Sequence, residues 1–363
     1  MLLTVDESFH GSPGAKHPGG HGDRPMLGTA FQVSKAVPFH DTGEQPTVSI
    51  VDGHDSRSES PSAYPPGMAE RVRLSDGRSL EAVVQGAEEG TLLIFHHGSP
   101  GAAEPFEPFH HAAADRGIVL AFYSRPGFGE SSRDEGRTVA SAAADAATLA
   151  DHLGHERFLT VGWSGGGPHA LACAALLPDR VRAAATIAGV APYDAEGLDW
   201  TAGMGEDNQI EYPTAARDPE ELLEWMQPHV RVMATIEPDE IVAELRSLIS
   251  DVDAEQVTGE FGENLAASLR SAFRHGPWGW YDDDLAFVGD WGFDLTRIRV
   301  PVSIWQGRHD LMVPISHGEW LAAHVPGARV HLRPEHGHLS LAVGAIGEIL
   351  DDLLDAAGLE RSA

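Results

Sequence analysis

The sequence contains little cysteine, little lysine and no long apolar run. Among its 363 residues Cys173 is the single cysteine, so no intramolecular disulfide can form. Lysine occurs only at Lys16 and Lys35, and 55 acidic against 25 basic residues give a formal net charge of −30. Such acidity repels phosphate backbones and argues against nucleic-acid binding. No run of about 18 apolar residues is present, so we expect no membrane span.

The first 67 residues differ in composition from the rest of the chain. They are rich in Gly, Pro, Ser, His and Asp and have little apolar periodicity, which predicts a disordered extension over residues 1–67. Their histidines are irregularly spaced and match no ligand template, so we expect no metal site. The acidic start lacks the apolar region of a secretory signal, which favours a cytoplasmic location. We expect the folded chain to begin near Met68.

A glycine-rich sequence places one serine on a sharp turn. Residues 157–161 predict a buried strand and residues 166–177 a buried helix, and Gly-Trp-Ser-Gly-Gly lies between them at 162–166. A serine on a strand-to-helix turn needs small neighbours two positions away on either side, and its hydroxyl then stands clear of the sheet. Ser164 is therefore the candidate nucleophile. The alternative is a glycine-rich turn with an idle serine.

A serine nucleophile needs a base, and the base needs an acid that orients it. Asp310 follows the predicted strand 300–305. His338 lies between the predicted strand 329–332 and a final apolar helix. The chain order serine, acid, histidine is that of one hydrolase class. We therefore predict that Ser164, Asp310 and His338 meet in one pocket.

Nearby residues compete for two of these roles. Glu335 and His309 are alternatives to Asp310, although a histidine would present the wrong chemistry, and Asp310 alone could simply form a turn. His336 is the alternative base. We favour His338 because it follows a glycine and directly precedes the apolar helix.

An oxyanion hole requires two backbone N–H groups. Gly165, directly after the candidate nucleophile, is expected to supply one. The second is expected on the loop 97–101, which follows the predicted strand 91–96. Because Pro100 has no N–H, Ser99 is the candidate donor. An ordinary Pro-Gly turn is the alternative interpretation of this loop.

Strands and helices alternate along residues 68–191 and again along 297–363, which predicts a parallel sheet. Residues 192–296 interrupt the alternation with three predicted helices, at 222–236, 241–248 and 261–273, and we interpret this segment as an inserted helical lid. Pro228 is expected to interrupt the first helix. The acidic runs 205–208 and 282–284 are expected to be solvated. Aromatic and methionine side chains predict an apolar pocket whose candidate substrate-binding residues are Trp163, Met204, Trp278 and Trp280.

The chain resembles the α/β-hydrolase fold superfamily over roughly residues 70 to 357. The motifs that carry the resemblance occur in the family's order, at 97–101, 124–131, 162–166, 307–314 and 337–338. The resemblance implies an α/β fold with a mostly parallel central sheet flanked by helices and an inserted helical cap. It also implies nucleophile, acid and base roles for Ser164, Asp310 and His338, and an oxyanion N–H from Ser99. The Arg-Pro-Gly-Phe-Gly loop within 124–131 is usually structural in that family.

The residues at and next to Ser164 argue against several classes of enzyme in this superfamily. In this superfamily, haloalkane dehalogenases and epoxide hydrolases carry aspartate where Ser164 stands, and C–C bond hydrolases often carry methionine where Gly165 stands. Proline iminopeptidases usually have tryptophan after the serine, whereas Trp163 precedes it here. We expect a serine hydrolase acting on a small or medium, largely apolar carboxylic ester through an acyl-enzyme.

Several alternatives to the ester hydrolase stay open. They are an amidase or aminopeptidase, a cofactor-free perhydrolase, and a binding protein that retains an unused site. We expect a small-molecule substrate, no cofactor, and a monomer or homodimer.

Overall fold

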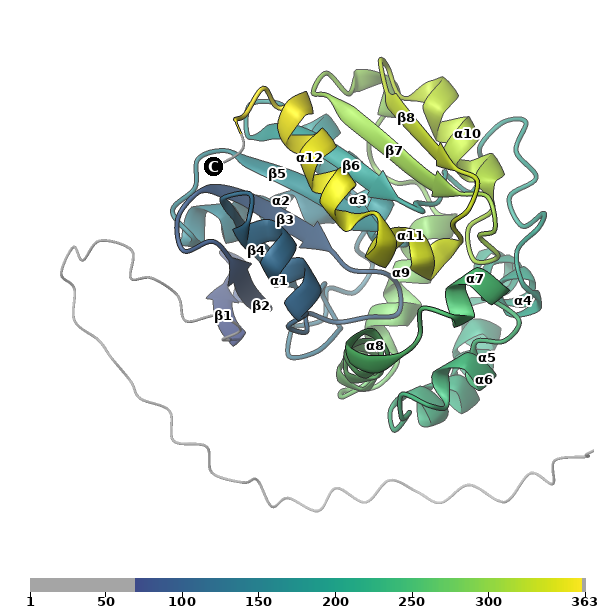
Figure 1. Cartoon of the computed structure of the whole chain (residues 1–363). Coiled ribbons are helices and arrows are strands. Elements are labelled where there is room, and N and C mark those ends of the chain that lie inside the picture. The colour runs from purple at the N-terminus through teal and green to yellow at the C-terminus, as the bar shows by residue number, and fades with distance from the viewer. Residues whose placement is uncertain (1–68, 361–363) are drawn as a thin grey trace, which may run out of the picture. The chain divides into compact units, whose positions relative to one another are not determined.

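The structure is a computed structural model that describes residues 69–360, and the predicted extension 1–67 lies outside them. Eight strands form one sheet in the order β1-β2-β4-β3-β5-β6-β7-β8 (Figure 1). The first two pairings, β1 with β2 and β2 with β4, are antiparallel, and all the others are parallel. The predicted mostly parallel sheet is therefore confirmed. The strands are β1 (Ala69–Arg73), β2 (Ser79–Gly86), β3 (Thr91–His96), β4 (Ile118–Tyr123), β5 (Phe158–Trp163), β6 (Val181–Ile187), β7 (Val302–Gly307) and β8 (Arg329–Arg333).

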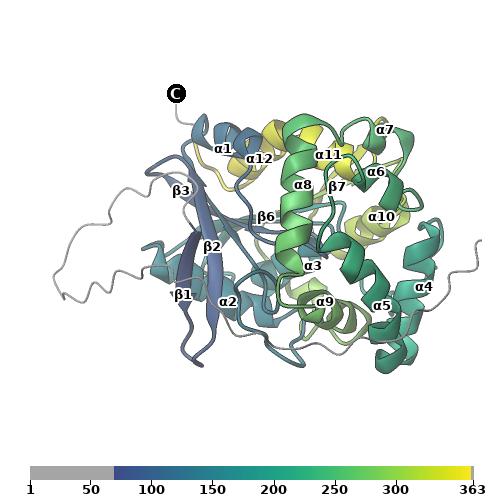
Figure 2. The ribbon, with the colours of Figure 1, turned by 90° about the horizontal axis from the view of Figure 1, so that it is seen from below.

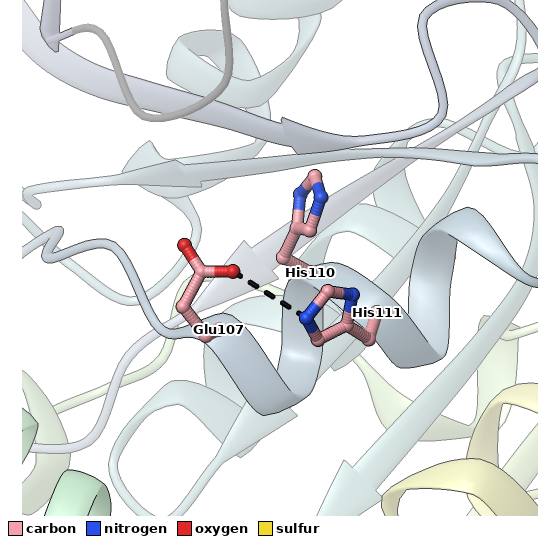
Figure 3. Close-up of side chains that lie close together, drawn as sticks. All are labelled: Glu107, His110 and His111. Carbon is pink, nitrogen blue, oxygen red and sulfur yellow. Dashed lines mark ion pairs between the residues drawn. The ribbon is translucent and has the colours of Figure 1, made fainter.

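Helices cover both faces of the sheet. One face carries α1 (Glu107–Ala114), α11 (His338–Gly344) and α12 (Ile346–Ala356), and the other carries α2 (Ser141–His152), α3 (Gly166–Leu176) and α10 (Ile315–His324) (Figure 1). Each covering helix faces the sheet with apolar residues, and the exposed side of α1 instead carries an ion pair between Glu107 and His111 (Figure 3). The expected flanking of the sheet by helices is confirmed.

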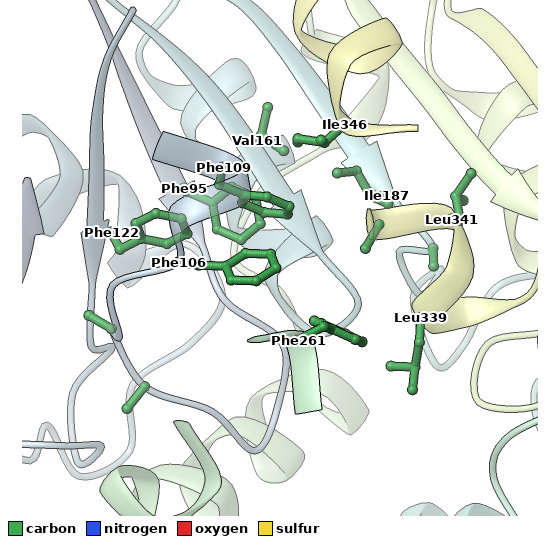
Figure 4. Packing of buried hydrophobic residues seen from close by; sticks show 14 of the residues in the cluster. Phe95, Phe106, Phe109, Phe122, Val161, Ile187, Phe261, Leu339, Leu341 and Ile346 are labelled. Atoms are coloured by element: carbon green, nitrogen blue, oxygen red, sulfur yellow. The ribbon is translucent and has the colours of Figure 1, made fainter. Parts of the chain in front are cut away.

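The central strands are buried on both sides. In β3, Leu93 and Phe95 belong to one hydrophobic cluster, whereas the alternating Leu92 and Ile94 belong to the other. Successive side chains of a strand point to opposite faces, so a strand covered on both faces is apolar throughout. Figure 4 shows the first cluster, in which Phe95 packs against the ring of Phe122 at 4.8 Å. This doubly buried sheet fixes the strand ends from which the site is built.

Between β6 and β7 the chain forms six helices, which gather on one side of the sheet (Figure 2). They are α4 (Glu206–Arg217), α5 (Pro219–Met233), α6 (Ile241–Glu244), α7 (Asp251–Ala254), α8 (Gly259–Ala272) and α9 (Trp278–Val288). A short 3-10 helix, η1 (Leu295–Arg297), precedes β7. Phe261 of α8 packs on Phe106, which lies just before α1, with ring centroids 5.8 Å apart (Figure 4). Aromatic packing thus joins this helical segment to the sheet domain.

The sequence-based prediction of this segment needs three corrections. Helix α5 continues through Pro228, because burial of Leu222, Met226 and Met233 along one face outweighs the lost backbone hydrogen bond. Helix α6 ends at Glu244 instead of extending to residue 248. Helices α4, α7 and α9 were not predicted, since their polar and acidic residues conceal the apolar periodicity.

The acidic run 282–284 is buried, contrary to the prediction that it is solvated. Asp282 is 3% exposed, and Asp283 and Asp284 are 0% exposed. Burial of a carboxylate is tolerated where cations compensate its charge. Asp283 pairs with Arg125 and Arg137, each at 2.6 Å.

Asp282 pairs with Arg133 at 2.8 Å, so the first two members of the acidic run have cationic partners.

Within residues 69–360, no helix has the length and apolarity needed to cross a membrane.

Candidate active site

Ser164 lies at the turn between β5 and α3. Its φ of 55° is in the left-handed region, and its N–H donates to the carbonyl of Ile187 at 2.8 Å. A Cβ on Gly162 would collide with the carbonyl oxygen of Gly166, and a Cβ on Gly166 would collide with that of His96. Only glycine fits at these two positions. The predicted strained turn is therefore present, with the serine at its apex.

Asp310 and His338 form a buried hydrogen-bonded pair. The Oδ2 atom of Asp310 lies 2.8 Å from Nδ1 of His338, and the two residues are 3% and 1% exposed. The Oδ1 atom of Asp310 accepts the N–H groups of Met312 at 2.9 Å and Val313 at 2.7 Å. Gln306 donates its amide to Oδ2 at 3.1 Å. The turn after β7 therefore fixes the carboxylate, and the carboxylate fixes the imidazole.

The rival residues do not form this pair. Glu335 is exposed, and the ring of His336 makes no hydrogen bond with Asp310 among the described residues. His309 contributes its backbone N–H to the carbonyl of His336 at 2.9 Å. The structure thus brings together Asp310 and His338 and leaves the other three outside the pair.

The two members of the pair have shifted pKa values. Burial opposes protonation of His338, but the carboxylate of Asp310, aided by Asp253, outweighs burial and raises the pKa of His338. Burial also raises the pKa of Asp310, against the opposing effects of His338 and the Val313 N–H. An imidazole with a raised pKa is a stronger proton acceptor, which suits a general base.

A cavity of about 350 Å³ lies between the sheet domain and the helical segment. Ser99, Ser164 and His338 line it from the sheet side, and residues of α4, α5, α6 and α8 line it from the other side. Since Nδ1 of His338 is held by Asp310, Nε2 is the nitrogen available to the serine. Within residues 69–360 no hydrogen bond joins Ser164 to His338, and such contacts are commonly long without substrate.

The predicted substrate-binding residues divide into two pairs. Trp163 and Trp280 line the cavity, and the ring of Trp163 lies 5.7 Å from that of His338. Met204 does not line it and is buried in the hydrophobic cluster that also contains Trp200 and Tyr212. Trp278 does not line it either, because its ring stacks under the guanidinium of Arg133 at 4.1 Å.

The candidate oxyanion donors, Ser99 and Gly165, lie side by side. A Cβ on Gly165 would lie 2.9 Å from the Cβ of Ser99. No acceptor within residues 69–360 takes the N–H of either residue. Arg125 anchors the loop that carries Ser99, because its guanidinium donates to the carbonyl of His97 and, at 3.1 Å, to that of Gly98.

Arg125 in turn pairs with Asp283 of α9, so the helical segment braces the loop that carries Ser99. Burial opposes ionisation of Asp283, but Arg125 and Arg137 outweigh it and lower the pKa of Asp283. From the sequence, the segment 124–131 that contains Arg125 is expected only to be structural. Nothing in the local sequence indicates its buried partner.

Asp253 of α7 was missed by the sequence analysis and is 0% exposed. Its carboxylate accepts the N–H groups of His338 at 2.9 Å, Leu339 at 2.9 Å and Ser340 at 2.8 Å, and the Ser340 hydroxyl at 2.9 Å. An anion at a helix N-terminus satisfies donors that lack partners in the helix. Asp253 therefore anchors the start of α11, which carries His338.

Among residues 69–360, one group of side chains could hold a metal ion, and it lies apart from the cavity. Glu107, His110 and His111 on α1 offer ligand atoms within 4.8 Å of one another (Figure 3). However, Nδ1 of His110 accepts the N–H of Gly86 at 2.9 Å, and Glu107 pairs with His111 at 3.7 Å. Such an i, i+4 pair is ordinary on an exposed helix. We assign no metal role to it.

Comparisons with known proteins agree with this architecture. A sequence model described as the alpha/beta hydrolase fold matches residues 91–345. The chain is 27% identical over 268 residues to the uncharacterized hydrolase YcgS of Bacillus subtilis, covering 73% of this chain and 89% of that one. It is 26% identical over 265 residues to a 2-hydroxy-6-oxononadienedioate/2-hydroxy-6-oxononatrienedioate hydrolase of Paraburkholderia phymatum, and the match covers 70% of this chain and 82% of that one.

Among solved structures, a thermophilic esterase from Thermogutta terrifontis superposes with a TM-score of 0.58. It is 20% identical and covers 80% of this chain and 99% of its own. At that identity the likeness supports the fold alone.

Proposed function

This chain belongs to the alpha/beta hydrolase fold family and is a hydrolase, and we propose that it cleaves small or medium, largely apolar carboxylic esters through an acyl-enzyme. The single observation that carries the proposal is that the apex serine and His338, whose imidazole is held by the buried Asp310, line one cavity. Ser164 is the nucleophile in this proposal, His338 the base and Asp310 the residue that orients it.

The proposed reaction has two steps. Nε2 of His338 accepts the proton of the Ser164 hydroxyl as its oxygen attacks the ester carbonyl, and the N–H groups of Ser99 and Gly165 stabilise the resulting oxyanion. The protonated imidazole then gives its proton to the leaving alcohol, and an acyl-enzyme remains. Water, deprotonated by His338, releases the acid and restores Ser164. Neither N–H group has an acceptor in the part of the chain that the structure describes, which supports this role.

We propose further that the helical segment within residues 192–296 acts as a cap over this site. Its helices supply most of the cavity wall opposite Ser164, including Trp225 and Met233 of α5 and Leu269 of α8. Apolar walls exclude water from the reacting groups and favour apolar acyl chains.

The proposal is tested with p-nitrophenyl esters of increasing acyl length and with proline p-nitroanilide, on the wild type and on Ser164→Ala. We expect hydrolysis of the esters by the wild type and loss of at least about a thousandfold in Ser164→Ala. Cleavage of the anilide alone would replace the esterase proposal with an aminopeptidase. Ester hydrolysis that persists in Ser164→Ala would exclude the proposed nucleophile.

A further inference from the structure

The cap contains a buried carboxyl pair without a cationic partner. Glu211 of α4 is 5% exposed and lines the cavity, and Asp284 of α9 is 0% exposed. The indole N–H of Trp280 donates to Oε1 of Glu211 at 2.7 Å. The ion pairs formed within residues 69–360 include neither carboxyl, although the adjacent Asp283 has two arginine partners.

The two carboxyl groups interact with each other. Burial, reinforced by the charge of Glu211, raises the pKa of Asp284 well above its ordinary value. Burial raises the pKa of Glu211 to about 7, although the neighbouring Asp284 carboxyl and the hydrogen bond from Trp280 favour its ionised form. Glu211 therefore ionises near neutrality without a counterion. A cation beside it would complete the pair and favour the carboxylate form.

The cavity around Glu211 suits a cation and disfavours an anion. No lysine or arginine lines it, whereas Asp207 and Glu244 line its cap side together with Glu211. Aromatic side chains share this wall, and the rings of Trp225 and Trp280 lie 5.8 Å apart at 64°. Aromatic faces attract organic cations, and a carboxylate adds a charge-assisted hydrogen bond. A ligand carboxylate would instead meet three acidic groups and no compensating cation.

We propose that the substrate carries an alkylammonium group, which binds Glu211 and the rings of Trp225 and Trp280 while the scissile carbonyl lies at Ser164. This inference rests on the proposed function, since Ser164 defines the reacting end. The three acidic residues all belong to the cap side of the cavity, and the candidate nucleophile and base belong to the sheet side. The ammonium group is therefore expected at the end of the substrate that is remote from the ester bond or on a side branch directed into the cap.

The test compares esters that differ only in the terminal group. One series is phenyl ω-aminohexanoate, phenyl heptanoate and monophenyl adipate, and a second varies the alcohol, as acetate esters of ω-aminopentanol and hexanol. In the wild type, kcat/KM for the ammonium ester should exceed that of the neutral ester by about tenfold or more in at least one series. The adipate ester should be the poorest substrate of its series.

Glu211→Gln is the decisive variant because it preserves the shape and the acceptor for Trp280. It should remove the preference for the ammonium ester. Glu206→Gln is the matched control, since Glu206 is exposed on the same helix and does not line the cavity. It should keep the preference. The proposal is overturned if neither series prefers the ammonium ester in the wild type, or if the preference survives in Glu211→Gln.

A binding measurement separates this inference from the ester proposal. Titration with pentylammonium, followed by tryptophan fluorescence, should saturate in the wild type, whereas pentanol and pentanoate should bind at least about tenfold more weakly. If no ester is hydrolysed yet pentylammonium binds selectively, the ester proposal fails and the ammonium site stands. If esters are hydrolysed but pentylammonium does not bind selectively, the ammonium site fails. If Glu211→Gln does not fold, the same titrations of the wild type and of Asp284→Asn decide the question. The wild type should bind pentylammonium more tightly than pentanol and pentanoate, and Asp284→Asn, which keeps Glu211, should retain this selectivity.

Discussion

Asp253→Asn isolates the contact between the cap and the candidate base. The carboxylate accepts two hydrogen bonds through Oδ2, from the N–H of His338 and the hydroxyl of Ser250, and three through Oδ1, from the N–H groups of Leu339 and Ser340 and the Ser340 hydroxyl. An asparagine oxygen can replace Oδ1, but its NH₂ group would face the His338 N–H. The bond from the His338 N–H is lost, the Ser250 hydroxyl has to accept instead of donate, and the three bonds to Oδ1 lose their charge assistance. We therefore expect a cost of about 2–3 kcal/mol in the free energy of unfolding.

The assay uses two measurements that need no knowledge of the natural substrate. Calorimetry should show a Tm lower by roughly 4–12 °C, at about 2–4 °C per kcal/mol for a domain of this size. The rate at which a fluorophosphonate labels Ser164 should fall about tenfold, equivalent to about 1.4 kcal/mol in the barrier. Because Asp253 helps to raise the pKa of His338, the acid limb of the labelling rate should also move to lower pH.

The matched control for Asp253→Asn is Asp251→Asn, an exposed position on the same short helix. It should leave both Tm and labelling rate close to those of the wild type. The reasoning is refuted if Asp253→Asn matches this control in Tm, labelling rate and pH profile. A lower Tm with an unchanged pH profile would mean that Asp253 stabilises the fold without acting on His338.

Two further substitutions have clear expected outcomes. Asp310→Asn should lower the rate of ester hydrolysis by about ten-thousandfold, because the amide favours the wrong imidazole tautomer. Because Asp310 raises the pKa of His338, the acid limb of the residual activity should move to lower pH; an unshifted limb would contradict the pairing. Asp283→Asn should lower the free energy of unfolding by about 3–5 kcal/mol, since it leaves Arg125 and Arg137 buried without their partner. The lowered pKa of Asp283 means that its contribution is complete above about pH 4 and is lost as pH falls further, so the difference in Tm from the wild type should narrow in acid. A difference in Tm that stays constant as the pH falls would contradict the assignment of this stability to the ion pairs of Asp283.

Local sequence predicted the parts of the site that depend on local geometry. The turn at Ser164 could be predicted because its glycines are required by contacts within five residues and with the neighbouring strand. The strands of the sheet were recognisable because burial on both faces leaves runs of apolar residues. Asp310 and His338 each follow a strand of the sheet, so their convergence follows from strand order.

The parts that sequence did not predict depend on distant partners. Asp253 contacts the backbone of a residue 85 positions away, and Asp283 pairs with an arginine 158 positions away. A carboxylate with such a partner is buried, whereas the same residue without one is solvated, and composition cannot distinguish the two cases. Met204 and Trp278 were predicted to bind substrate but do not line the cavity. An apolar side chain in this helical segment can pack against a neighbouring residue or line a cavity, and the sequence does not distinguish the two.

The central claim, that Ser164 is a nucleophile activated by His338, is tested most directly by covalent labelling. The wild-type protein is incubated with a fluorophosphonate, and the adduct is measured by intact mass and located by peptide mapping. We predict one adduct on Ser164, with labelling lost in Ser164→Ala and strongly slowed in His338→Ala. A folded wild-type protein that stays unlabelled, or an adduct that maps to another residue, would contradict the account.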